Sequence, residues 1–345
     1  MKYIEIITES IEFYDLIKKF NHSITIVSND LLENYIKDFK KAGISERRKE
    51  LGYHEYKDTS LGYKPFNNEE FEQLNQSWNV NDWISQNLSQ LIPKEGRSPI
   101  YNFMGKISDI LTKDLQEYLK NKFGNELNLG KSLKRKRNVS EITVSVWWKR
   151  SKPNSNYFGI YNMDKYDARY SNNITNIEVI IDKDIWTENI QNNVMSFIFG
   201  EQVNWNFISK NIIPTLVHEI QHLMQDIKGN HFRKNLLVSK KKEKESNDLN
   251  RNFQIYISRL SEIDAHATGA ASELINDLIL DNLKEEDWNN EIKLILKYPL
   301  DYIPQSEFFK YLDGYDEKEF NPFLIKKVKQ RFLKTFIKRI QSYLR

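Results

Sequence analysis

The stretch "PTLVHEIQHLMQ", residues 214–225, holds two of the six histidines of a 345-residue chain, placed four positions apart. On an α-helix His218 and His222 would lie one turn apart on the same face, so both imidazoles could reach one ion. Glu219 would lie about 100° round the helix, where it could contact a water on that ion without binding the ion itself. Apart from Glu219, residues 211–224 carry no charged side chain, which is typical of a helix buried at the floor of a cleft.

Composition restricts the chemistry that the chain can support. The absence of cysteine excludes disulfides, thiolate metal sites and cysteine nucleophiles, so histidine, carboxylate or carbonyl groups must hold any metal. The formal net charge of +3 favours no class of partner. The opening segment "MKYIEIITESIEFYD" carries acids inside its apolar run, unlike a signal peptide, and no run has the length of a membrane span. We therefore expect a soluble, cytoplasmic protein.

Periodicity predicts the elements that flank the motif. Alternation of apolar and polar residues indicates a half-buried strand at 141–148, and two more strands are expected at 156–162 and 176–182. We expect Pro214 near the start of the motif helix or at a kink in it, which would put the motif in the first two turns. Apolar residues at helical spacing predict further helices over 28–43 (from Ser28 to a stop at Gly43), 67–93 (one or two), 100–124 (ending at Gly124), around 193–199, and 253–280.

The order of these elements predicts an α+β fold in three parts. Residues 1–95 form a mainly helical N-terminal region of unknown role, 96–300 a catalytic domain with a small mixed sheet, and 301–345 a basic amphipathic helical extension. Strands precede the motif helix, and a lysine-rich insert over 233–250 separates that helix from the next. The regular alternation of a doubly wound sheet is missing.

A hydrolytic metal site needs a third protein ligand, and the segment "SRLSEIDAHATGAAS", residues 258–272, is the best source. The metzincin continuation of the motif is absent, because Gln225 and Lys228 stand at its glycine and histidine positions. In the later segment Glu262 shares one helix face with Ala265, His266 and Gly269, and this small-residue stripe allows close approach of another helix. Asp264, about 200° round, is the rival ligand. The face of Asp264 also carries small residues, so the stripe does not choose between the two acids. The longer reach of the glutamate side chain favours Glu262, as does the resemblance described next.

The segments "HEIQH" and "SEIDAHA" together resemble the gluzincin branch of the zincin metallopeptidases, over roughly residues 100–285. In that family two histidines come from the active-site helix and a glutamate from a later helix. The resemblance implies a zincin-like domain with His218, His222 and Glu262 as zinc ligands and Glu219 as general base. The frequent E-x-x-x-D pattern of the family would put an acid at 266, where this chain has His266. Asp264 or His266 therefore remains open as partner of the zinc-binding histidines.

These patterns predict a zinc-dependent metallopeptidase acting on a protein or peptide substrate. Zinc lowers the pKa of a bound water to about 7, and Glu219 would take its proton. Tyr256 and His266 are candidates to stabilise the oxyanion, although each is more often structural. An extended substrate could pair with the edge of strand 141–148 or 176–182. Two other functions stay open: a zinc amidase acting on a non-protein bond of cell-wall type, and a nucleic-acid- or membrane-associated protein with a vestigial metal site.

Two basic segments could contact nucleic acid or an anionic surface. Residues 131–152 include four consecutive basic residues and two tryptophans, and 322–345 hold eight basic residues without an acid. The simpler interpretation of residues 131–152 is that they form a solvated loop leading into a strand. For the second, we expect the apolar stripe to pack on the domain and leave the lysines in water. This stripe consists of Ile325, Val328, Phe332, Phe336 and Ile340.

Overall fold

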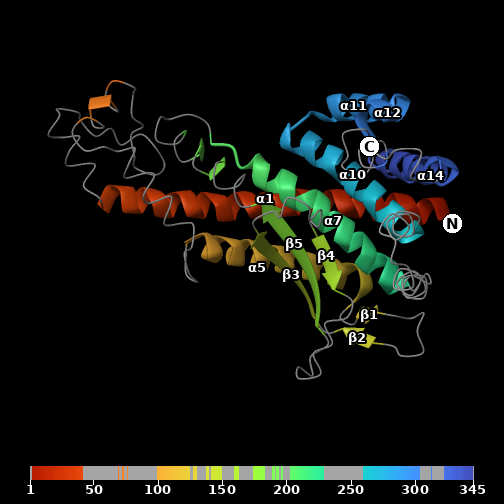
Figure 1. Ribbon diagram of the computed structural model, residues 1–345, viewed down its shortest axis with the longest axis horizontal. Coiled ribbons are helices and arrows are strands. Elements are labelled where there is room, and N and C mark those ends of the chain that lie inside the picture. Colours follow the sequence, from red (N-terminus) through yellow and green to blue (C-terminus); the bar gives the residue numbers. More distant parts are fainter. Residues whose placement is uncertain are drawn as a thin grey trace.

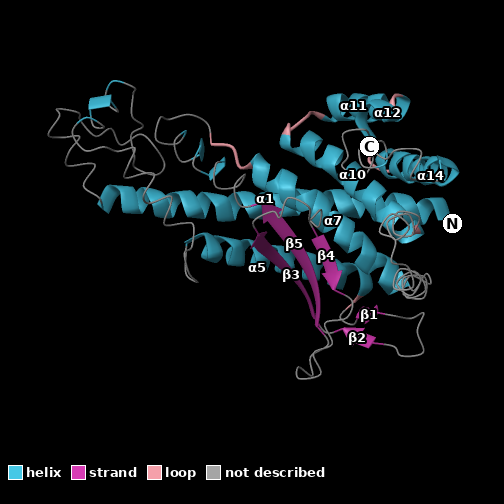
Figure 2. Cartoon of the chain, viewed as in Figure 1, coloured by secondary structure: helices cyan, strands magenta, loops and turns pink. Residues whose placement is uncertain are grey.

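The structure is a computed structural model, and the part of the chain that it describes is mostly helical with a small sheet (Figure 2). The helices predicted over 67–93 and around 193–199 fall almost wholly outside this part, and the insert over 233–250 falls wholly outside it. The described residues are 2–41, 69, 72–73, 76, 99–124, 127–129, 137–139, 141–149, 159–162, 174–182, 189–190, 192–193, 196, 203–228, 259–303, 312 and 322–344.

Helix α1 (Lys2–Lys41) runs along the long axis of the molecule as a single helix (Figure 1). The prediction that a helix begins at Ser28 is therefore wrong. Ser28 is fully buried in the helix interior, and its hydroxyl donates to the carbonyl of Ile24 at 2.7 Å instead of capping a helix end. A continuous apolar face explains the uninterrupted helix. It consists of Phe13, Leu16, Ile17, Phe20, Ile24, Val27, Leu31 and Leu32, all buried.

Helix α5 (Pro99–Phe123) ends where the sequence predicts, because Gly124 adopts a left-handed backbone with φ of 81°. The strands follow it. A short antiparallel pair, β1 (Leu127–Leu129) and β2 (Arg137–Val139), lies at the start of the basic segment. The main sheet has the order β3–β5–β4, made of β3 (Glu141–Lys149), β5 (Ile174–Asp182) and β4 (Gly159–Asn162). All three strands of this sheet lie within the segments where the sequence predicts strands.

The main sheet is mixed, because β5 pairs in parallel with β3 and antiparallel with β4. The prediction that residues 176–182 offer a free edge is wrong, since β5 is the central strand. The outer edge of β3 is covered by α5. The Ser108 hydroxyl accepts from the amide of Val146, and the Thr112 hydroxyl accepts from the amide of Val144, at 2.9 and 2.8 Å. In the described part of the chain β4 is the other edge of this sheet.

The motif lies on α7 (Asn206–Lys228), which starts well before Pro214. The prediction that the motif occupies the first two turns is therefore wrong. The Asn204 side chain accepts from the amide of Asn206 at 2.8 Å and so caps the helix start. A proline inside a helix costs about 3 kcal/mol. Burial of the first turns offsets this cost, through Trp205, Ile208, Ile212 and Ile213.

The remaining helices are α10 (Leu260–Leu280), α11 (Glu285–Lys297), α12 (Pro299–Tyr302) and α14 (Pro322–Gln341). Helix α7 packs against α10 and also against β4 and β5, so the motif lies between the sheet and α10. Among the described helices, none is long and apolar enough to cross a membrane.

The first and last helices share their core with the middle of the chain. The stripe of α14 packs inward as expected, with Val328, Phe332, Phe336 and Ile340 at most 2% exposed. Buried side chains of α1 and α14 belong to the same cluster as those of α5, α7 and α10. The division of the chain at residues 95 and 300 stays a prediction, as does contact of the basic segments with a partner.

Candidate metal centre

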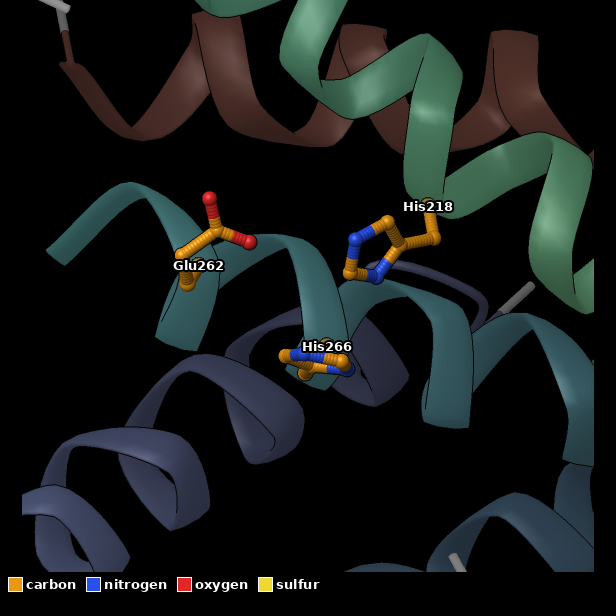
Figure 3. A group of neighbouring side chains, drawn as sticks. All are labelled: His218, Glu262 and His266. Atoms are coloured by element: carbon orange, nitrogen blue, oxygen red, sulfur yellow. The ribbon is translucent and has the colours of Figure 1, made fainter. Parts of the chain in front are cut away.

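Two facing helices each contribute a pair of side chains one turn apart. Helix α7 carries His218 and His222, and α10 carries Glu262 and His266. Figure 3 shows Glu262 and His218 turned toward each other, with His266 beside them. The His218 ring lies 4.4 Å from the His266 ring and 4.9 Å from the His222 ring, between centroids. The structure therefore gathers two pairs of chemically active side chains, each at i and i+4, in one place.

A glycine allows the two helices to approach each other at this point. A Cβ atom on Gly269 would lie 3.3 Å from the carbonyl oxygen of Pro214 and 3.4 Å from the Cβ of His218. Neighbouring positions on α10 are also small and buried, among them Ala265. The small-residue stripe seen in the sequence thus brings α10 against α7 next to the first histidine of the motif.

The side chains of His218, Glu262 and His266 form a cluster that could hold a metal ion, because one ligand atom of each lies within 4.8 Å of those of the other two. His222 also faces this cluster. Its Nε2 atom lies 3.2 Å from Nε2 of His218 and 3.3 Å from Oε2 of Glu262. Glu219 Oε1 lies 3.9 Å from Nε2 of His218. The carboxylates and His222 are at most 7% exposed.

The two separations that involve His222 fit a tetrahedral ion. Zinc binds imidazole nitrogen at about 2.0–2.1 Å, so two of its donor atoms lie about 3.3 Å apart. The distances from His222 to His218 and Glu262 are 3.2 and 3.3 Å. One N–H hydrogen can point at only one of these two neighbours, whereas a single cation among the three atoms contacts all of them. Imidazole and carboxylate donors suit zinc and other first-row metals, so the donor set alone does not identify the ion.

Burial and neighbouring charges set the protonation of the cluster when no metal is bound. Burial lowers the pKa of His222, but the Glu262 carboxylate, together with Glu219 and Gln225, outweighs it and raises that pKa to about 9. Burial raises the pKa of Glu262, but the charge and hydrogen bond of His222, together with the charges of His218 and Arg259, outweigh it and lower that pKa to about 2. Burial, together with the charge of His222, lowers the pKa of His266 to about 3. Burial likewise holds the pKa of His218 well below its usual range. One ion pair and two neutral imidazoles result.

Of the other predicted site residues, the structure describes Asp264, which lies outside the cluster. Asp264 turns toward α14, where its carboxylate accepts from the Arg331 guanidinium at 2.9 Å and from the Thr335 hydroxyl at 3.0 Å. Of the two acids predicted as possible third ligands, Asp264 therefore contacts α14 and only Glu262 faces α7. Tyr256 lies outside the described residues.

Gln225 is a contact of His222 that sequence reasoning missed. Its side chain lies 3.2 Å from Nδ1 of His222 and also contacts the backbone of Ser261 on α10. In the sequence it stands out only because it breaks the metzincin continuation of the motif. The sequence feature that could have identified this contact is the position of Gln225 three residues after His222, on the same helix face.

No protein-family model, curated protein or solved structure matches this chain.

Proposed function

We propose that this chain is a zinc-dependent metallopeptidase that hydrolyses peptide bonds in protein or peptide substrates. Its metal ligands would be His218, His222 and Glu262, as in the gluzincin pattern. The observation that carries the proposal is the position of His222, whose Nε2 lies 3.2 Å from His218 and 3.3 Å from Glu262. Three protein donors are the number that catalytic zinc sites use, because a fourth position must stay open.

The chain supplies the groups that hydrolysis requires around such an ion. A bound zinc ion acidifies water and polarises a carbonyl oxygen. Glu219 is buried and close to His218 without belonging to the His218–Glu262–His266 cluster, which suits a carboxylate that accepts a proton and delivers it to the leaving amine. His266 contacts the His218 ring where the family pattern has an acid. A neutral imidazole there can orient His218 or serve as an additional donor to the ion.

The sheet offers one place where an extended substrate could pair. Strand β4 lies at the sheet edge in the described part of the chain and packs against α7. An edge strand beside the motif helix supports binding of a peptide as an added strand, since its outward backbone groups would give main-chain hydrogen bonds.

Metal content and turnover together test the proposal. Plasma mass spectrometry on the purified wild type should find one zinc ion per chain, lost in His218→Ala. The Glu219→Gln variant should keep zinc and fold but lose about 10²- to 10⁴-fold in turnover of a quenched fluorescent peptide library. A wild type that takes up no metal on reconstitution would overturn the metal site. Full peptide turnover by Glu219→Gln would overturn the mechanism, and turnover of cell-wall amides alone would favour the amidase.

A further inference from the structure

Gln225 bridges the two helices that carry the metal-binding side chains. Its amide nitrogen donates to the carbonyl oxygen of Ser261 at 3.3 Å, and its amide oxygen lies 3.2 Å from Nδ1 of His222. Ser261 directly precedes Glu262 in α10. One side chain on α7 thus contacts a histidine of the site and the residue next to its carboxylate.

These two contacts fix the direction of both hydrogen bonds. A backbone carbonyl only accepts, so the NH₂ end of the Gln225 amide must face Ser261. The amide oxygen then faces His222, and an amide oxygen only accepts. The Nδ1 atom of His222 must therefore carry a hydrogen and donate it. A neutral imidazole with its hydrogen on Nδ1 has its lone pair on Nε2, and that atom faces His218 and Glu262.

We propose that Gln225 is a positioning residue that holds His222 with its Nε2 lone pair directed at the metal and ties it to the turn that carries Glu262. This inference rests on the proposed function, because it requires His222 to bind the ion. Partners of this kind orient the ring and raise its basicity, and their loss typically weakens metal binding about 10- to 100-fold. The amide of Gln225 does both while joining the two helices.

A second glutamine on the same helix provides a matched control. Gln221 lies one turn before Gln225, and its amide oxygen accepts from the guanidinium of Arg339 on α14 at 3.1 Å. Both glutamines join α7 to another helix, but the Gln221 contact leads to α14 and not to the metal-binding pair. Removing the Gln221 amide takes an acceptor from a half-buried guanidinium, which destabilises the fold without changing the contacts of His222.

The test compares Gln225→Met, Gln225→Glu and Gln221→Met with the wild type. Zinc affinity is measured by competition with a chromogenic chelator, and the Nδ1 hydrogen of His222 is followed by NMR of the zinc-loaded protein. Gln225→Met should bind zinc about 10- to 100-fold more weakly and lose the exchange-protected Nδ1–H signal. Gln225→Glu should recover most of the affinity, since a carboxylate accepts the same hydrogen. Gln221→Met should lose thermal stability and keep its zinc affinity.

The outcomes separate this inference from the proposed function. Zinc binding by Gln225→Met within about twofold of the wild type, or an equal loss in Gln221→Met, would overturn the role of Gln225 alone, since loss of a positioning partner costs more than this. A wild-type chain that binds no zinc would overturn the proposed function and the inference with it.

Discussion

The Nε2 atom of His222 lies 3.3 Å from Oε2 of Glu262, although the two residues belong to different helices. Without metal the two side chains form a buried ion pair. With metal they would be two of its donors. This double use places a proton where the proposed metal would bind, so proton and metal would compete for one site.

Substitution of the two acids on α10 should separate metal binding from packing. Glu262→Gln should lose zinc affinity by more than about 100-fold, beyond the effect of losing a supporting hydrogen bond. Asp264→Asn should keep its zinc, because Asp264 contacts only α14 among the site elements described. Its bond to half-exposed Arg331 contributes about 0–1 kcal/mol to stability. Metal content and thermal unfolding of both variants check this, and zinc loss confined to Asp264→Asn would reverse the assignment.

Zinc binding should release a proton at neutral pH. The pKa of His222 is raised to about 9 in the metal-free protein, so below that pH the ion must displace the hydrogen on Nε2. Apparent zinc affinity should therefore rise about tenfold per pH unit from neutrality toward 9. Isothermal titration calorimetry in buffers of different ionisation enthalpy measures the proton count. Uptake of zinc without proton release would show that His222 is neutral or does not bind the ion.

The metal-free protein should lose stability in acid. The pKa of His266 falls from 6.5 to about 3 on folding, so its contribution is fully present above 6.5 and is lost as pH falls toward 3. The pKa of His218, held low by burial, acts in the same direction. The variant His266→Gln should show a smaller drop in melting temperature between neutral and acid pH, with chelator present. Substitution of exposed His22 on α1 serves as control. A drop in melting temperature between neutral and acid pH that is as large in His266→Gln as in the wild type would contradict the prediction.

The contact at Gly269 should govern how closely the helices approach. Gly269→Val should destabilise the protein by about 1–3 kcal/mol through overpacking. It should also weaken zinc binding, because the new atoms press on Pro214 and His218. A Cβ atom added to Gly105 on α5 would meet no atom of the described residues within 4 Å. Gly105→Ala should therefore stabilise the helix by about 0.5–1 kcal/mol. Denaturant unfolding and chelator competition measure both, and tight zinc binding by Gly269→Val would show that the site tolerates a wider helix spacing.

Local patterns predicted most elements but misplaced three helix starts, those at Ser28 and Pro214 and that of α10, which begins at Leu260 and not at 253. Strand-forming segments located β3, β4 and β5, and Gly124 marked the end of α5, because these signals are local in the chain. Ser28 and Pro214 are also local signals, but each predicted a helix start at the wrong position. The apolar face of α1 continues through Ser28, and the buried residues before Pro214 keep α7 helical. Burial against other elements outweighed the preference of each residue for a helix end.

The sequence by itself determined that His218 and His222 share a helix face with Glu219 beside them, because helical geometry fixes spacing at short range. It also supplied the small residues that let α10 approach. Only the tertiary structure decided which acid of α10 faces α7, because the answer depends on where α14 packs and binds Asp264. The bridge from Gln225 to Ser261 likewise exists only once the two helices meet. Which face of α10 turns toward α7 depends on how distant segments pack. A local sequence pattern does not contain that information.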